Sequence, residues 1–171
     1  AVPLKKVVPS VRAPAPVRAS APAATPVDPR EAARRAFAEG RISLAQLEGV
    51  NARLLAGNAQ LAERLMGAGQ GDQALSIWKG LVALEPREAH FHLGCAAVHA
   101  ARGEWKDALP WLDRAVERNG RMTAALVLRG EARLHGGDVR GAVTDLQQAL
   151  RVGQPAADAH ARRAQVLLAA L

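Results

Sequence analysis

From residue 28 onward, apolar residues recur at the three-to-four-residue spacing of amphipathic helices, and glycine or proline interrupts them at short intervals. Asp28 and Ser43 are expected helix starts, with the first helix ending at Gly40 and the second running to about Gly57. Further helices are predicted in pairs, over residues 58–68 and 72–84, 89–101 and 105–118, and 123–135 and 139–152.

Landmark residues of the paired helices recur every 34 residues. Each copy has a glycine between its two helices, followed by an alanine, a large apolar residue and a further small or apolar residue. The three copies are Gly69, Ala74, Trp78, Leu81; Gly103, Ala108, Leu112, Ala115; and Gly137, Ala142, Leu146, Ala149. This period and order resemble the tetratricopeptide repeat (TPR). The resemblance implies an all-α fold, a right-handed superhelical array of antiparallel helix pairs.

This organisation divides the chain into four parts. Residues 1–27 form a basic, Pro/Ala-rich extended arm, and residues 28–57 form a degenerate N-terminal helix pair. Residues 58–156 hold three repeats, and residues 157–171 form a C-terminal capping helix, because terminal units of such arrays commonly serve as caps.

Composition agrees with closely packed helices. Apolar content is 49%, mostly Ala, Leu and Val, with three Trp, two Phe and no Tyr. The single cysteine, Cys95, excludes an internal disulfide and favours a reducing compartment. No apolar run is long enough for a membrane span, and the start AVPLKK lacks a signal-peptide core. We therefore expect a cytoplasmic protein, although a signal removed before residue 1 would leave the same sequence.

The net charge of +7 is concentrated in the arm, because residues 1–30 contain five bases and one acid. Six prolines within residues 1–27 predict an extended, polyproline-like segment. It is interpreted either as a linker or as a docking element for a second partner. We do not expect contact with nucleic acid or an anionic membrane, because the bases are sparse and no aromatic residue lies among them.

In an array of this kind, the first helices of successive repeats line a concave groove that binds a partner. On the resemblance, this face is largely apolar and should accept an extended or helical apolar segment of a protein, with its two glutamates available for pairing. The alternative is that individual positions only contact the neighbouring helix. The predicted groove residues are Ala59, Glu63, Met66, His90, Leu93, Ala97, Ala100, Val127, Glu131 and Leu134.

Two further sets of residues have a structural interpretation. His92, Cys95 and His99 share one side of a helix and could present ligands to zinc, but three ligands do not close a structural site and the repeat places them in the core. Trp78, Trp105 and Trp111 are likewise expected in the core. We predict no metal and no cofactor. No phosphate-binding loop, nucleophile elbow or paired carboxylates suggest an enzyme.

A closer resemblance covers residues 37–152. The segments AEGRISLAQLEGV, HFHLGCAAVHAARGEWKDAL and LVLRGEARLHGGDVRGAVTDL are similar to tandem-repeat chaperones of type III secretion translocators. This implies a cytoplasmic chaperone that holds an apolar segment of a secreted protein and forms homodimers through its N-terminal helices. The Lys, Arg and Asn residues that clamp acidic tails in other repeat proteins are absent here. The alternative role is an adaptor or assembly scaffold with the same fold.

Overall fold

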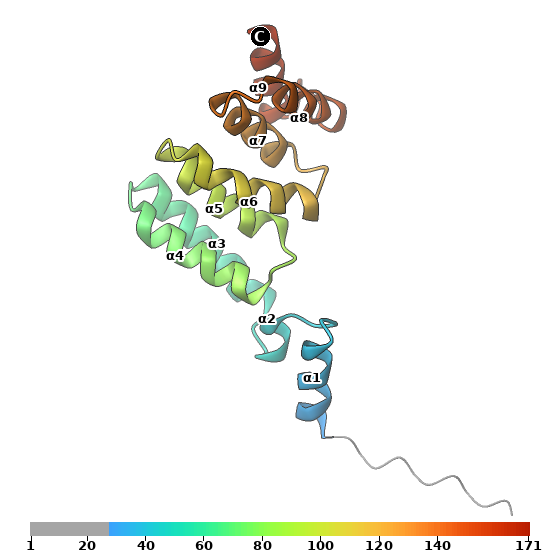
Figure 1. Ribbon diagram of the computed structural model, residues 1–171. Helices are drawn as coiled ribbons and strands as arrows, with labels where there is room; N and C mark the ends of the chain where they lie inside the picture. The colour runs from blue at the N-terminus through green and yellow to red at the C-terminus, as the bar shows by residue number, and fades with distance from the viewer. Residues whose placement is uncertain (1–27) are drawn as a thin grey trace, which may run out of the picture.

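The computed structural model describes residues 28–171, in which every regular element is a helix. The helices stack as an array with α1 and α2 at one end and α9 at the other (Figure 1). Their bounds are α1 (Pro29–Ala38), α2 (Leu44–Leu47), α3 (Ala52–Gly67), α4 (Gly71–Leu84), α5 (Ala89–Ala101), α6 (Trp105–Arg118), α7 (Thr123–His135), α8 (Val139–Val152) and α9 (Ala159–Ala169). The predicted all-α repeat fold is confirmed, whereas the predicted arm lies outside the described residues. In the described part, no helix is long and apolar enough to cross a membrane.

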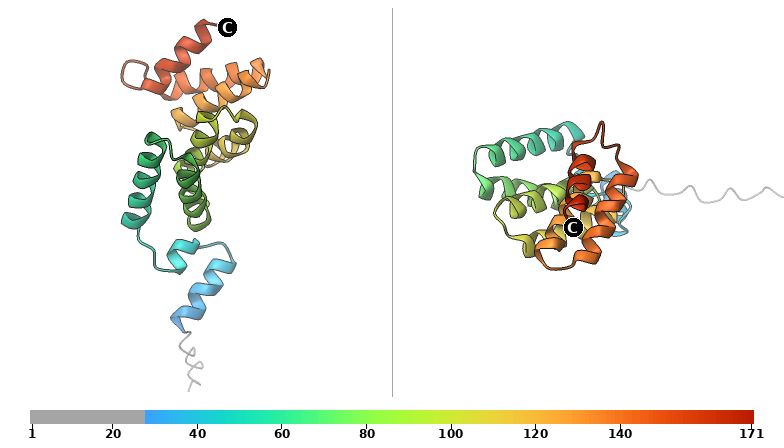
Figure 2. Two further views of the ribbon diagram at one scale, coloured as in Figure 1. Left: turned by 90° about the vertical axis from the view of Figure 1, so that its left-hand side faces the viewer. Right: turned by 90° about the horizontal axis from the view of Figure 1, so that it is seen from above.

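Three helix pairs form the body of the array. The pairs are α3 with α4, α5 with α6, and α7 with α8, and each pair packs against the next. The glycines between the paired helices adopt positive φ angles of 75° at Gly69, 74° at Gly103 and 82° at Gly137. A residue without Cβ takes this conformation at little cost, so each helix reverses within a few residues. Seen from above, successive pairs are rotated relative to one another (Figure 2).

The N-terminal region differs from the prediction. The predicted helix starts at Ser43, where Ser43 and Gln46 form a capping box, but α2 ends after one turn at Leu47. Gly49 then adopts a φ of 69°, and the Asn51 side chain accepts a hydrogen bond from the Leu54 amide at 2.9 Å. These features end one helix and start another. The predicted helix from Ser43 to about Gly57 is therefore wrong, and the first repeat helix begins at Ala52 instead of residue 58.

The core runs along the array as three overlapping clusters. One cluster joins α3, α4 and α5 around Trp78, a second joins α5, α6 and α7 around Leu112, and a third joins α7, α8 and α9 around Leu146. Trp78 lies directly against Gly94, where a Cβ atom would come within 2.3 Å of the indole ring. The absence of a side chain at Gly94 thus lets α4 and α5 approach closely.

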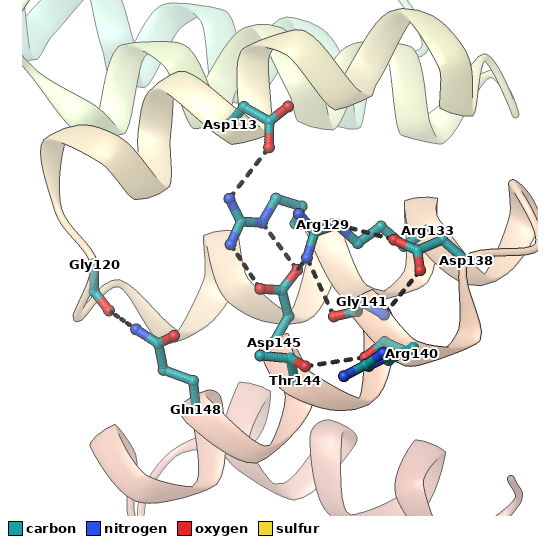
Figure 3. Close-up of polar contacts among 10 residues, drawn as sticks. All are labelled: Asp113, Gly120, Arg129, Arg133, Asp138, Arg140, Gly141, Thr144, Asp145 and Gln148. Carbon is teal, nitrogen blue, oxygen red and sulfur yellow. Dashed lines mark hydrogen bonds and ion pairs between the residues drawn. The ribbon is translucent and has the colours of Figure 1, made fainter.

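A buried ionic network joins α6, α7 and α8 (Figure 3). The Asp145 side chain, only 1% exposed, accepts hydrogen bonds from Arg129 at 2.6 and 2.9 Å and from Arg133 at 2.8 Å. Arg129 also donates to Asp113 on α6 at 3.2 Å. Burial lowers the pKa of Arg129, but the hydrogen bond and charge of Asp145 outweigh burial and leave that pKa raised.

Candidate functional site

The first helices of the pairs, together with α9, line two cavities on one side of the array. The larger cavity, of about 670 Å³, lies between α3, α5 and the loop that joins α4 to α5. It is lined by Ala52, Leu55, Ala56, Ala59, Gln60, Glu63, Glu85, Arg87, Glu88, His90 and Phe91. The smaller cavity, of about 230 Å³, lies between α5, α7 and α9. It is lined by Leu93, Ala97, Ala124, Val127, Leu128, Glu131, His160 and Arg163.

Seven of the ten predicted groove residues line these cavities. Ala59, Glu63 and His90 line the larger one, and the smaller one is lined by Leu93, Ala97, Val127 and Glu131. The other three residues line neither. Met66 and Ala100 pack against the core clusters, and Leu134 is half-buried.

The larger cavity, here called the acidic cavity, combines an apolar floor with carboxylates. Leu55, Ala59 and Phe91 are buried at its base. Glu63 approaches His90, with 3.5 Å between Oε1 and Nε2. Two further carboxylates reach it from the α4–α5 loop: Glu85, Glu88.

The hydrogen-bond partners of these carboxylates are neutral groups. Glu88 accepts a hydrogen bond from the His90 amide at 3.3 Å, and Glu85 accepts one from the Ser43 hydroxyl. Within residues 28–171, none of the cavity carboxylates is paired with a lysine or arginine. Arg87 instead donates to the Gly40 carbonyl at 2.6 Å. The cavity therefore has an excess of negative charge.

The smaller cavity, here called the apolar cavity, differs in its charge. Glu131 is 6% exposed and its carboxylate is hydrogen-bonded to Arg163 of α9. Leu93, Ala97 and Val127 supply the apolar surface beside this pair. The carboxylate that we expected to be available to a partner is thus already neutralised within the chain.

A sequence profile for the tetratricopeptide repeat matches residues 60–123 and 127–170. The chain belongs to the tetratricopeptide repeat family. The human tetratricopeptide repeat protein 34 is 32% identical to it over 81 residues, which are 47% of this chain and 14% of that protein. The chain thus spans only a small part of that curated relative.

Solved structures of similar shape include several type III secretion proteins. A type III secretion complex from Aeromonas hydrophila has a TM-score of 0.72 at 26% identity, covering 81% of this TPR chain and 94% of that chain. PcrH of Pseudomonas aeruginosa, in complex with the chaperone binding region of PopB, has a TM-score of 0.63 at 26% identity over 69% and 97%. The translocator chaperone SycD of Yersinia enterocolitica shares the fold, with a TM-score of 0.70 at 20% identity over 76% and 98%.

The three side chains of this TPR protein that were considered as zinc ligands are buried or engaged in other contacts. His92 Nε2 lies 2.9 Å from the Pro86 carbonyl, and His99 Nδ1 lies 2.7 Å from Glu104. Cys95 is fully buried, and burial raises the pKa of its thiol to about 12, so the thiolate form that binds metals is disfavoured. In the described part of the chain, His99, Glu104 and Asp107 come within 4.8 Å of one another, and the His99 and Glu104 side chains of this group are hydrogen-bonded to each other.

The three tryptophans occupy different environments. Trp78 is 1% exposed in the core, as expected, and Trp111 packs against two of the core clusters. Trp105 is half-buried and stacks on His135, with ring centroids 4.3 Å apart. The stack joins the start of α6 to the end of α7.

Sequence reasoning missed the cavity residues that do not lie on the first helices of repeats. Glu85, Arg87 and Glu88 come from the α4–α5 loop, and His160 and Arg163 come from α9. The position of α9 could have been found, since its first residue follows that of α7 by about one repeat length. The loop side chains could not, because their direction depends on Arg87 reaching back to Gly40.

Proposed function

We propose that this TPR protein binds an extended or helical apolar segment of a partner protein along the face formed by α3, α5 and α7, as a secretion-type chaperone. The observation that carries this proposal is the pair of cavities, each with apolar surface, that residues of α3, α5 and α7 line. Binding to such a face removes apolar surface of both proteins from water, which stabilises the complex. The function is binding rather than catalysis, in a cytoplasmic setting.

The similar structures support the choice of partner class. PcrH is complexed with the chaperone binding regions of PopB and PopD, at 26% and 27% identity to this chain. We infer that the partner here is a secreted, membrane-active protein with an apolar chaperone-binding segment. The whole face, and not one cavity, would hold that segment, because the two cavities lie on successive helices of one array.

Site-specific photo-crosslinking of the full chain in its native cell tests the proposal. A photoreactive residue at Ala97, in the apolar cavity, should yield an adduct with one secreted protein, identified by mass spectrometry. The matched control is Ala101, which is exposed on the same helix and lines neither cavity. Equal crosslinking from both positions, or adducts only from Ala101, would contradict the proposal.

Two substitutions sharpen the test. Leu93→Glu puts a charge into the apolar cavity, and Ala56→Arg obstructs the acidic cavity at an exposed position. Both should abolish the adduct from Ala97. Ala56→Arg should leave helical content and the melting temperature unchanged, so its effect is separable from unfolding even if Leu93→Glu destabilises the core.

We also propose that α1 mediates self-association. This helix packs only against α2 among the described helices, and its Phe37 is 41% exposed. Size-exclusion chromatography with light scattering should show a dimer for the native chain and a monomer for Phe37→Glu. A monomeric native chain would remove this part of the proposal.

A further inference from the structure

The chain carries a segment whose chemistry complements the acidic cavity. Residues 1–27 contain four bases and no acid: Lys5, Lys6, Arg12, Arg18. Nearly all the other residues of this segment are Pro, Ala, Val or Leu. An apolar, proline-rich chain with regularly placed bases is the kind of ligand that an apolar floor surrounded by carboxylates attracts.

The acidic cavity differs from the apolar cavity in its charge, which determines how strongly it attracts a basic segment. Its carboxylates at Glu63, Glu85 and Glu88 form no ion pair with a lysine or arginine of the described residues, and they outnumber Arg87, the one guanidinium group in the lining of this cavity. In the apolar cavity, Arg163 already neutralises Glu131. Basic side chains would therefore gain more from the acidic cavity than from the apolar cavity.

The cavity lies within reach of residues 1–27. Helix α1 begins at Pro29 and is about 15 Å long. Just beyond its end, the Gly40 carbonyl is bonded to Arg87, which lines the cavity. A polyproline-type chain rises about 3.1 Å per residue, so roughly ten residues before Asp28 would cover the return along α1. The segment with Lys5, Lys6 and Arg12 is left over to enter the cavity.

We propose that this basic segment, residues 3–12, occupies the acidic cavity of its own chain and competes there with the partner protein. The apolar residues lie over Leu55 and Phe91, and the bases lie near the cavity carboxylates. This inference rests on the proposed function only in treating the acidic cavity as part of the partner-binding face. Because residues 3–12 are tethered to the chain that forms the cavity, their effective concentration there is high. The segment can therefore compete although it binds weakly, and the partner protein can displace it.

Paramagnetic relaxation enhancement in the full chain tests this placement. A cysteine introduced at Ser10 can be spin-labelled selectively, because Cys95 is fully buried. The amide signals of Ala56 and Gln60, in the acidic cavity, should broaden, whereas those of Thr144 on α8 should not. Mixing isotope-labelled chain without spin label and unlabelled chain with it must abolish the broadening. Broadening that survives mixing means that a second copy supplies the segment, which overturns the proposal.

Charge reversal identifies the interaction. Glu63→Lys, or the triple change Lys5→Glu, Lys6→Glu and Arg12→Glu, should remove the broadening, and combining them should restore part of it. Glu117→Lys, at an exposed position on α6, is the matched control and should have no effect. No broadening in the native chain, or broadening that Glu117→Lys removes equally, overturns the proposal.

The photo-crosslinking from Ala97 is scored separately in the same variants. A native chain that captures its partner but shows no broadening at the acidic cavity leaves the proposed function standing and removes only this inference. Conversely, broadening without any crosslinked partner supports the placement of residues 3–12 and removes the proposed function. If both hold, the triple change in the segment should raise the yield of partner adduct.

Discussion

The second and third repeats place chemically opposite residues at the same three positions. Cys95, His99 and Trp111 of the α5–α6 pair correspond, 34 residues on, to Arg129, Arg133 and Asp145 of the α7–α8 pair. In the first set, Cys95 is fully buried, Trp111 packs against the core cluster that contains it, and His99 is hydrogen-bonded to Glu104. The second is a network in which a buried carboxylate receives hydrogen bonds from two guanidinium groups.

Both repeats nevertheless form the same helix pair. Their shared residues explain why: an alanine, a leucine and an alanine of each second helix are completely buried. These are Ala108, Leu112 and Ala115 in α6 and Ala142, Leu146 and Ala149 in α8. The small and apolar landmarks set how closely the two helices of a pair pack. The three variable positions determine which side chains fill the interior between these helices.

Removing the central carboxylate of the network is expected to have the largest effect. Asp145→Ala leaves Arg129 and Arg133 largely buried without the carboxylate that they share, which costs about 3–5 kcal/mol. Urea unfolding followed by circular dichroism measures the loss. The control is Asp113→Ala, which removes a partner of the same Arg129 whose side chain is 53% exposed and should cost less than about 1 kcal/mol. Equal losses would mean that the network is not the stabilising element of the third repeat.

Replacing the network with the uncharged residues that the first repeat has at the same positions tests the opposite direction. The positions equivalent to Arg129, Arg133 and Asp145 in the first repeat are Leu61, Leu65 and Ile77. The triple change Arg129→Leu, Arg133→Leu and Asp145→Ile removes the three buried charges of the network together. Stability should be unchanged or higher by about 1–4 kcal/mol, because no buried ion of the network is left unpaired. A triple variant as unstable as Asp145→Ala would show that the helix pair requires its ionic interior.

The sequence predicted the repeat frame well but not this network. The bounds of α5, α6, α7 and α8 match the prediction because a glycine and a set of small residues mark each of them. In contrast, Arg129 and Asp145 lie 16 residues apart on different helices, and no local spacing connects them. The helix starting at Ser43 was predicted too long because the conformation of Gly49 and the cap at Asn51 were not recognised. The acidic cavity was predicted only in part, since two of its carboxylates come from a loop.

The stability of the interface between the first and second repeats should depend on close steric packing, whereas that of the third repeat depends on its ionic network. Gly94→Ala would bring a Cβ atom to 2.3 Å from the Trp78 ring and should destabilise the protein by about 1–3 kcal/mol in thermal or urea unfolding. Gly80→Ala is the matched control, because nothing lies within 4 Å of its new methyl group. It should stabilise α4 by about 0.5–1 kcal/mol. A neutral Gly94→Ala would show that α4 and α5 can separate freely.

The smallest expected effect concerns the N-terminal caps of α7 and α9. The N-cap of α7 is Met122, which makes no side-chain hydrogen bond, whereas Asp158 caps α9 by accepting from the amides of His160 at 2.8 Å and Ala161 at 3.3 Å. Asp158→Ala should therefore cost about 1 kcal/mol in urea unfolding at neutral pH. An equal cost for Met122→Ala would remove the contrast between the two helix starts.

The pH dependence of that cost separates capping from packing. Hydrogen bonding from the Thr123 side chain, and from the two amides, holds the pKa of Asp158 below its ordinary value. Because the folded-state pKa is depressed, the stabilisation is present above the unfolded pKa and is lost as pH falls through the folded pKa. The difference between the native chain and Asp158→Ala should thus shrink below about pH 4. A difference that stays constant into strong acid would mean that the Asp158 side chain acts through contacts independent of its charge.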